Sequence, residues 1–169
     1  MTARELAEGD LRSLVVELED ARARLDRLAA EIASLDTGPA AAPNRATLAL
    51  ISVDLHSYYT ILESLIERLA VTLEGRLPPG PATQTELLRS AVRPLPGVRP
   101  AILDGSALDA LDELRRFRHF FRHAYALDLR FDKLRRVLDP FGALHGTVSA
   151  DLARFTAFLT KLIEALTRG

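Results

Sequence analysis

The chain has 169 residues, 48% of them apolar, and a formal net charge of −1. It contains no cysteine, which excludes disulfides and thiolate catalysis, and its near-neutral charge argues against a generally basic nucleic-acid binder. Leucine, alanine and arginine are plentiful and β-branched residues are sparse, so we expect an all-α protein with one helical domain over residues 1–169. Its apolar runs are far shorter than a membrane span. We therefore expect a cytoplasmic protein with no membrane partner.

The first half of the chain predicts two long helices. The first runs from about Ala3 to Asp36. Its apolar residues alternate three- and four-residue spacings at Leu11, Leu14, Leu18, Ala21, Leu25, Leu28, Ile32 and Leu35. This heptad seam suits residues 1–36 to a long antiparallel partner in the bundle or to a coiled coil, and we expect them to pack on the bundle. After a linker, helical spacing resumes from about Asn44 to Glu74 and stops at Gly75, which we expect to be a C-terminal cap by residue type.

The second half alternates loops with three further helices. We expect a loop at Arg76–Thr83, a short helix at Thr85–Val92 and a second loop with Pro94, Pro96, Gly97 and Pro100. A fourth helix follows, from a cap at Asp104 or Ser106 to about Tyr125. After a turn at Leu127–Phe131, the last helix covers Asp132–Thr167. Pro140 either kinks this last helix or begins a new one after Asp139. The pattern predicts an up-and-down bundle of four or five helices.

The segment from Phe117 to Tyr125 is the most informative part of the chain. It places two arginines, two histidines and a tyrosine among three phenylalanines within nine residues. Arginine stays charged, and histidine gains or loses a proton near neutrality, so together they suffice for phosphodiester chemistry without a metal. From Leu111 to Arg136 there are eight Lys/Arg against four Asp/Glu, a local charge of +4 against −5 for the remainder. This distribution favours one anionic ligand over a wrapped duplex.

Helical periodicity sorts the fourth helix into three stripes. They are an apolar stripe of Leu114, Phe117, Phe121 and Ala124, a basic stripe of Arg115, Arg118, Arg122 and Tyr125, and a mixed stripe of Asp112, Arg116, His119 and His123. We expect Phe117, Phe120 and Phe121 to be packing residues and not base-stacking platforms, and the cationic and titratable groups to face outward on two flanks. Taken alone, such a basic stripe is usually a solvated face.

The histidines allow a second interpretation. His119 and His123 are four residues apart, a spacing at which two imidazoles can share a metal ion. Only Asp112 offers a further ligand on that face, and thiolates are absent, so we expect no metal site and no cofactor. His56 and His145 stand alone on other helices, and we expect them at the surface or at the edge of the core.

Four residues separate Arg118 from His123, and one residue separates His123 from Tyr125. This spacing resembles the Arg-x4-His-x-Tyr signature of HepT-like toxins in the HEPN ribonuclease superfamily. The order of other segments is also similar, over about Leu48 to Leu162: Leu55–Tyr59 with Ile61–Glu63, Leu77–Gly80, Leu87-Leu88 and Pro96–Pro100. Two features depart from the pattern. Thr83-Gln84 stands where many relatives carry Trp-His, and His119 follows the arginine where Asn or Asp is frequent.

The resemblance implies a HEPN-like helical bundle that acts as a metal-independent endoribonuclease toxin on RNA. It implies Arg118 and His123 as the catalytic residues and a nucleotidyltransferase-like antitoxin as the partner. In the family, the tyrosine of the motif can be nucleotidylated by that antitoxin, which marks Tyr125 as a possible modification site.

Cleavage by attack of a ribose 2′-hydroxyl needs a base, an acid and stabilisation of the phosphorane. His123 is the candidate base or acid, and Arg118 the candidate phosphate ligand. On an ideal helix, residues five apart point about 140° from one another. Either the helix loosens near Ala124, or two copies of it meet across a two-fold axis. We favour the second option, a homodimer in which His119 and Arg122 are auxiliary phosphate contacts.

Two other functions compete with this one. The long heptad helix and the loop departures are also consistent with a non-catalytic HEPN bundle that binds and regulates a partner nucleotidyltransferase. The third possibility is a structural bundle or coiled coil in which the basic flank is coincidental.

Overall fold

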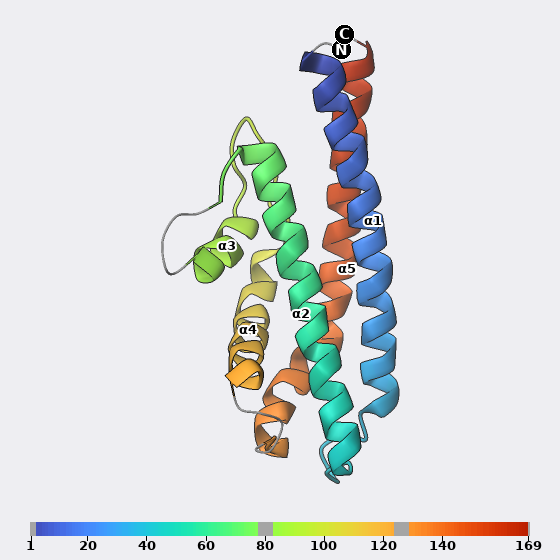
Figure 1. The fold of residues 1–169 in the computed structure, drawn as a ribbon, viewed down its shortest axis with the longest axis vertical. Coiled ribbons are helices and arrows are strands. Elements are labelled where there is room, and N and C mark those ends of the chain that lie inside the picture. Colours follow the sequence, from blue (N-terminus) through green and yellow to red (C-terminus); the bar gives the residue numbers. More distant parts are fainter. Residues whose placement is uncertain (1–2, 78–82, 124–128, 169) are drawn as a thin grey trace.

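The computed structural model of the chain describes residues 3–77, 83–123 and 129–168, and it confirms the all-α bundle (Figure 1). Its elements are α1 (Ala3–Leu35), α2 (Arg45–Glu74), α3 (Thr83–Ala91), a 3₁₀ turn η1 (Gly105–Ala107), α4 (Leu108–His123) and α5 (Phe131–Arg168). No helix in the described ranges has both the length and the apolar content to cross a membrane.

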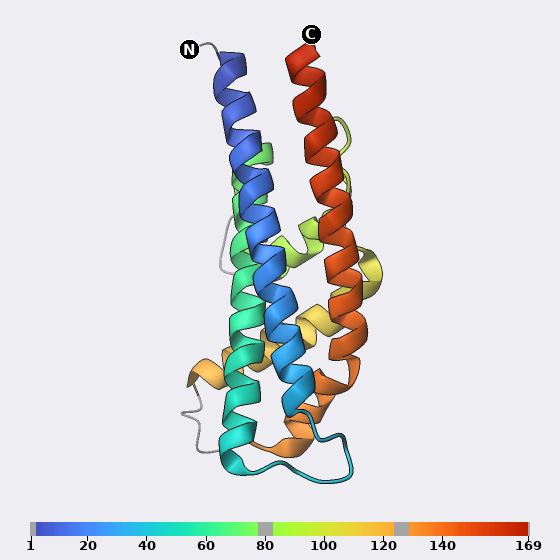
Figure 2. The ribbon, with the colours of Figure 1, turned by 90° about the vertical axis from the view of Figure 1, so that its right-hand side faces the viewer.

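The long helices run up and down, and both ends of the chain lie at the same end of the bundle (Figures 1 and 2). α1 packs along α2 and α5, whereas α4 packs against α2 and α5 on the opposite side, with the short α3 beside it. The heptad seam of α1 forms the contact as predicted. Its members Leu11, Leu14, Leu18, Ala21, Leu25 and Ile32 are buried, and Leu28 and Leu35 are partly buried.

Both ends of α2 are capped, and Gly75 is the C-terminal cap that the sequence predicts. The Asn44 side chain accepts a hydrogen bond from the Thr47 amide at 2.9 Å, which satisfies a free donor at the helix start. At the other end, Gly75 has a φ of +75°, a left-handed conformation that glycine adopts without strain, and its N–H donates to the Val71 carbonyl.

Other boundaries differ from the expectation. α3 begins at Thr83, two residues early, and Phe131 begins α5 instead of ending a turn. α5 continues through Pro140, so a new helix after Asp139 is wrong. Figure 1 shows the axis of α5 turning in its orange, N-terminal part. A proline inside a helix removes one backbone hydrogen bond and bends the axis, and packing against the neighbouring helices keeps both halves helical.

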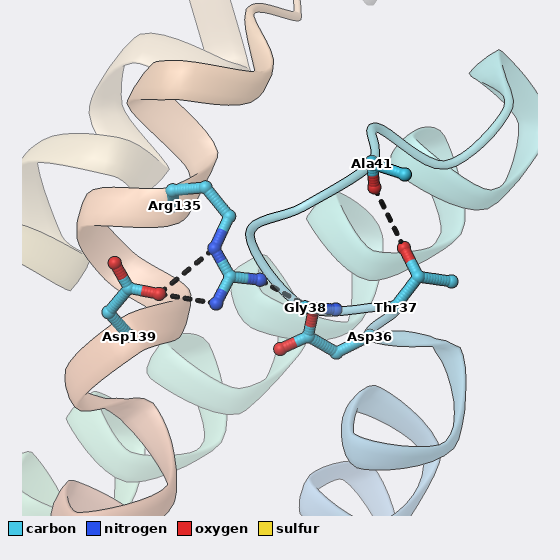
Figure 3. Close-up of polar contacts among 6 residues, drawn as sticks. All are labelled: Asp36, Thr37, Gly38, Ala41, Arg135 and Asp139. Atoms are coloured by element: carbon cyan, nitrogen blue, oxygen red, sulfur yellow. Dashed lines mark hydrogen bonds and ion pairs between the residues drawn. The ribbon is translucent and has the colours of Figure 1, made fainter.

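The connection between α1 and α2 is tied to α5 (Figure 3). The guanidinium of Arg135 lies between two carboxylates, bonding Asp36 at 2.5 Å and Asp139 one turn along α5. Asp36 also accepts the Gly38 amide at 2.9 Å. One arginine therefore fixes the end of α1, the start of the loop and the first turns of α5.

A second polar tie joins three helices in the middle of the bundle. The hydroxyl of Tyr58, on α2, lies 3.0 Å from Nδ1 of His145, on α5. Nε2 of the same imidazole lies 3.1 Å from Asp26 on α1. A neutral imidazole with its proton on Nε2 satisfies both contacts, because Nδ1 then accepts from the tyrosine O–H. His145 therefore lies at the core edge, as expected, but it is not alone.

Candidate functional site

Two buried charged side chains, Asp151 and Arg99, fix the start of α4. Asp104 caps η1 by accepting the Ser106 amide at 2.8 Å, and its own backbone N–H donates to Asp151 of α5 at 2.7 Å. In the preceding loop, the buried side chain of Arg99 bonds Glu74 at 2.7 Å and the carbonyls of Ser90, Arg93 and Pro100. These contacts set the position of α4 along α2 and α5.

Arg118 faces α2, not solvent. Its Nη1 lies 2.8 Å from Oε2 of Glu63, and the two side chains are only 12% and 8% exposed. The guanidinium also lies 5.5 Å from the centre of the Tyr59 ring. The expectation that the basic stripe faces outward is therefore wrong for Arg118, because α2 presents a carboxylate and an aromatic ring where that stripe meets it.

Burial dominates the electrostatics of this contact. It raises the pKa of Glu63, and the charge of Arg118 opposes that rise only in part. Burial raises the pKa of Tyr59 as well, so this phenol is neutral at physiological pH. An ion pair at this depth loses most of the hydration of both ions, which makes it a weak source of stability but a strong constraint on geometry.

The contact leaves hydrogen-bonding capacity unused. Within the described residues, four buried side-chain atoms lack a hydrogen-bond partner, and three of them are Nδ1 of His56, Oε1 of Glu63 and Nε of Arg118. Unpaired buried polar atoms are rare in folded proteins because each costs free energy. These three atoms lie along one contact of α2 with α4, so this contact leaves polar groups of both helices unsatisfied.

His56 belongs to this site. Its ring lies 5.7 Å from that of Phe121, between centroids. Burial lowers the pKa of His56, and the charges of Arg118 and Arg122 lower it further, so it is neutral at physiological pH. Its expected place at the core edge agrees with its partial burial, but it is not isolated as predicted.

The other arginines of the stripe differ in how they are paired. Arg115 is partly buried and forms an ion pair with Asp112 at 2.9 Å. The same carboxylate pairs with Arg116 at 2.8 Å. Arg122 is exposed, has no ion pair among the described residues, and acts electrostatically on Glu63 and His56. A cation without a counter-ion beside unpaired polar atoms favours an anionic ligand.

The remaining predicted site residues lie at or beyond the end of α4. His119 is exposed on that helix. His123 is its last residue, but its side chain lies outside the described part of the chain, as do Ala124 and Tyr125. Residues 118–123 are all helical, so positions 118 and 123 differ by about 140° around the axis. The meeting of the Arg118 and His123 side chains stays a prediction.

Sequence reasoning missed the residues that α2 contributes. His56, Tyr59 and Glu63 follow a three- and four-residue spacing, so they share one face of α2. The available signal was Glu63 itself, an acid placed between the buried Leu62 and Ile66 within an apolar stretch. Within the described residues, no group of three or more His, Cys, Asp or Glu side chains is arranged to hold a metal ion.

Comparison with known proteins identifies the family. Searches of curated proteins and of solved structures found no match. A family model described as HepT-like protein matches residues 50–159, which include most of α2, all of α3 and α4, and most of α5. This range covers well over half of the chain and contains both sides of the Arg118 contact. The chain therefore belongs to the HepT-like family.

Proposed function

We propose that this HepT-like protein is a metal-independent endoribonuclease, the toxin of a toxin–antitoxin pair. One observation carries this function: Arg118 is fixed against Glu63 and Tyr59 while Arg122, on the same stripe, is exposed and unpaired among the described residues. A fixed guanidinium beside a free one suits a phosphate of RNA, since arginine binds phosphate oxygens through a planar pair of donors.

The proposed reaction is attack of a ribose 2′-hydroxyl on the adjacent phosphorus. A base removes the hydroxyl proton, O2′ bonds to phosphorus, and the bond to O5′ breaks as an acid protonates the leaving oxygen. The products are a 2′,3′-cyclic phosphate and a free 5′-hydroxyl. His123 is the proposed proton-transfer group, and Arg118 stabilises the charged phosphorane, with Arg122 and His119 as auxiliary phosphate ligands.

We place this site at the interface of a homodimer. Positions 118 and 123 lie about 140° apart on a regular helix, so one copy of α4 presents them poorly to a single phosphate. Two copies related by a two-fold axis supply two imidazoles and two guanidiniums around one cleft. One histidine then acts as base and the other as acid.

The nuclease is tested with purified protein and single-stranded RNA in EDTA. Wild type is expected to leave 2′,3′-cyclic phosphate ends, and His123→Ala to lose at least about 100-fold in rate, the usual contribution of a general acid or base. Arg12→Gln, an exposed arginine at the far end of α1, is the matched control. Equal rates for wild type and His123→Ala would contradict the proposal.

Mixing wild type with His123→Ala tests the dimer. If one cleft uses the histidines of both protomers, a mixed dimer lacks its acid or its base, and equal mixing should leave roughly a quarter of the wild-type activity at the same total protein concentration. If Arg118 and His123 act within one protomer, the mixture keeps roughly half. Thermal melting of His123→Ala separates loss of chemistry from loss of fold.

The proposed partner is a nucleotidyltransferase-like antitoxin, acting with the toxin in the cytoplasm. The family relationship supports this pairing, and the motif position of Tyr125 makes its hydroxyl the proposed point of nucleotidylation. Co-expression with the neighbouring gene followed by intact-mass analysis tests it. A nucleotidyl adduct that Tyr125→Phe abolishes is the expected result, and an adduct that persists in this variant would place the modification elsewhere.

The buried Arg118–Glu63 ion pair also favours a second function, a non-catalytic bundle that binds and regulates a nucleotidyltransferase. In that case Arg118 has a structural role, holding α4 on α2. This function predicts a stable complex with the partner and no RNA cleavage by wild type at any protein concentration.

A further inference from the structure

A second basic surface lies on the other flank of α4, where this helix meets the start of α5. A cavity of about 200 Å³ there is lined by Glu113, Arg116, Phe117, Phe120, Lys133, Arg136 and Val137. Phe117 is buried, but Phe120 is partly exposed and lies outside the main hydrophobic cluster. Phe120 therefore borders this cavity with part of its side chain exposed, which opens the base-stacking role that the sequence argued against.

The charges around the cavity are not balanced. Lys133 and Arg136 are exposed, stand three residues apart on one face of α5, and form no ion pair within the described ranges. The Lys133 ammonium instead lies 4.8 Å from the centre of the Phe120 ring. Arg135, between them, differs because Asp36 and Asp139 neutralise it. The fold therefore leaves two cations beside an aromatic ring without a carboxylate partner among the described residues.

This cavity and the Arg118 site are connected around the surface of α4. Arg118 faces α2, whereas Arg116 and Phe120 border the cavity toward α5. Helical periodicity places position 123, with Asp112 and His119, on the arc between them. Because an α-helix with its side chains is about 10 Å across, a nucleic-acid strand crossing this arc reaches both places within a few nucleotides.

We propose that the α4–α5 cavity binds a nucleotide of single-stranded RNA that flanks the scissile phosphate, with its base on Phe120 and its phosphate between Lys133 and Arg136. Proteins hold single strands in this way, by stacking bases on aromatic rings beside a basic track. Lysine has a flexible stem, so its ammonium can leave the ring for a phosphate as the base arrives. An acidic peptide would use the cations but not the ring, which favours RNA as the ligand.

Binding of a non-cleavable RNA tests this site separately from catalysis. The probe is a short single-stranded oligonucleotide with 2′-O-methyl riboses, followed by fluorescence anisotropy over a range of salt concentrations. We expect the Lys133→Gln, Arg136→Gln double variant to weaken binding about tenfold and to reduce the salt slope by about 0.7, the value for one single-strand phosphate that is no longer neutralised. Phe120→Leu is expected to weaken binding about fivefold without changing that slope.

Lys161→Gln is the matched control, because Lys161 is an exposed lysine of the same helix far from the cavity. Because this inference rests on the proposed nuclease function, each result must separate the two. If wild type binds and cleaves RNA while the double variant binds equally well, the flanking site is wrong and the nuclease stands. If wild type binds without cleaving and the double variant loses binding, the site stands and the nuclease is wrong.

Two results would overturn the RNA site directly. If wild type fails to bind the oligonucleotide, both the RNA site and the nuclease function are contradicted. Normal RNA affinity in the double variant, combined with loss of a co-purifying protein partner, would instead assign the cavity to an acidic protein segment.

Discussion

At the residue scale, the central feature is one guanidinium held between a carboxylate and a phenol. Arg118 donates to Glu63 through Nη1, while its Nε and Oε1 of Glu63 remain unpaired among the described residues. The pair fixes the direction of the arginine at the cost of dehydrating two ions. A phosphate bound here would meet a guanidinium that is already oriented, which reduces the entropy lost on binding.

Removing the carboxylate tests how firmly Arg118 depends on it. Glu63→Ala is expected to destabilise the protein by about 3 kcal/mol, because a buried arginine is left without its counter-ion. Glu63→Gln keeps an acceptor and is expected to cost less. Urea unfolding of wild type and both variants provides the measurement, and a cost below that of an ordinary surface substitution would show that Arg118 is not held by Glu63.

The same carboxylate makes stability depend on pH with an unusual sign. Because burial raises the pKa of Glu63 above 4.5, the folded state binds its proton more tightly than the unfolded state does. This contribution is fully present below the unfolded pKa and is lost as pH rises through the folded one. Relative to wild type, Glu63→Gln should therefore gain stability as the pH is raised from 4 to 7. An unchanged difference in unfolding free energy would contradict the raised pKa.

His56 reports the charge of the basic stripe. Its pKa lies below the ordinary 6.5, first through burial and then through Arg118 and Arg122. Arg122→Gln should raise the pKa of His56, since one repelling charge is removed. Arg116→Gln, whose side chain pairs with Asp112, is the control. An NMR titration of the imidazole protons measures both, and equal shifts in the two variants would show that Arg122 is too distant to act.

At the element scale, polar contacts from α5 and from the preceding loop fix the start of α4. Asp151 is buried and accepts the backbone N–H of Asp104, while it also pairs with Arg154 at 3.0 Å. Arg99 fixes the preceding loop through Glu74 and three backbone carbonyls. These contacts keep Arg118 in register with Glu63, because a slide of α4 by one turn would separate them by about 5 Å.

Asp151→Ala should release this register. It leaves a backbone donor unpaired at the start of η1, and we expect a loss of about 2 kcal/mol in unfolding free energy. Hydrogen exchange should quicken in α4 more than in α1, because the polar partners of Asp151 among the described residues are Asp104 and Arg154, neither of which lies on α1. Asp20→Ala, on the exposed surface of α1, is the control. Uniform quickening across all helices would show that Asp151 supports the whole bundle and not α4 in particular.

At the scale of the whole molecule, polar contacts decide how the long helices sit against one another. The contact of Tyr58, His145 and Asp26 joins α2, α5 and α1 through a single imidazole. Arg135 joins the end of α1 to the start of α5. Apolar seams alone tolerate small slides between helices, whereas these directional bonds permit one alignment.

Tyr58→Phe should cost about 1 kcal/mol, because Nδ1 of His145 loses its donor. Asp26→Asn should weaken the contact of the same imidazole at Nε2. The double variant should therefore cost less than the sum of the two single changes, since the contacts share one ring. Denaturant unfolding of the four proteins measures this coupling. Strict additivity would show that the tyrosine and the aspartate act independently.

The sequence by itself determined the helical elements and the family. Heptad spacing predicted α1, Asn44 and Gly75 marked the ends of α2, and the Arg-x4-His-x-Tyr motif indicated a HepT-like chain, whereas the catalytic roles of its residues stay a prediction. These features depend on residues close together in the chain, so local periodicity and capping chemistry reveal them.

Only the tertiary structure decided what Arg118 faces. The basic stripe resembles a solvated surface in the sequence, yet it meets Glu63, Tyr59 and His56, which precede it by about fifty residues or more. Such contacts depend on which face of α2 turns toward α4, and that is set by the combined packing of all the long helices. The spacing of residues within α4 does not predict that Arg118 is buried, because desolvation depends on the helices packed around it.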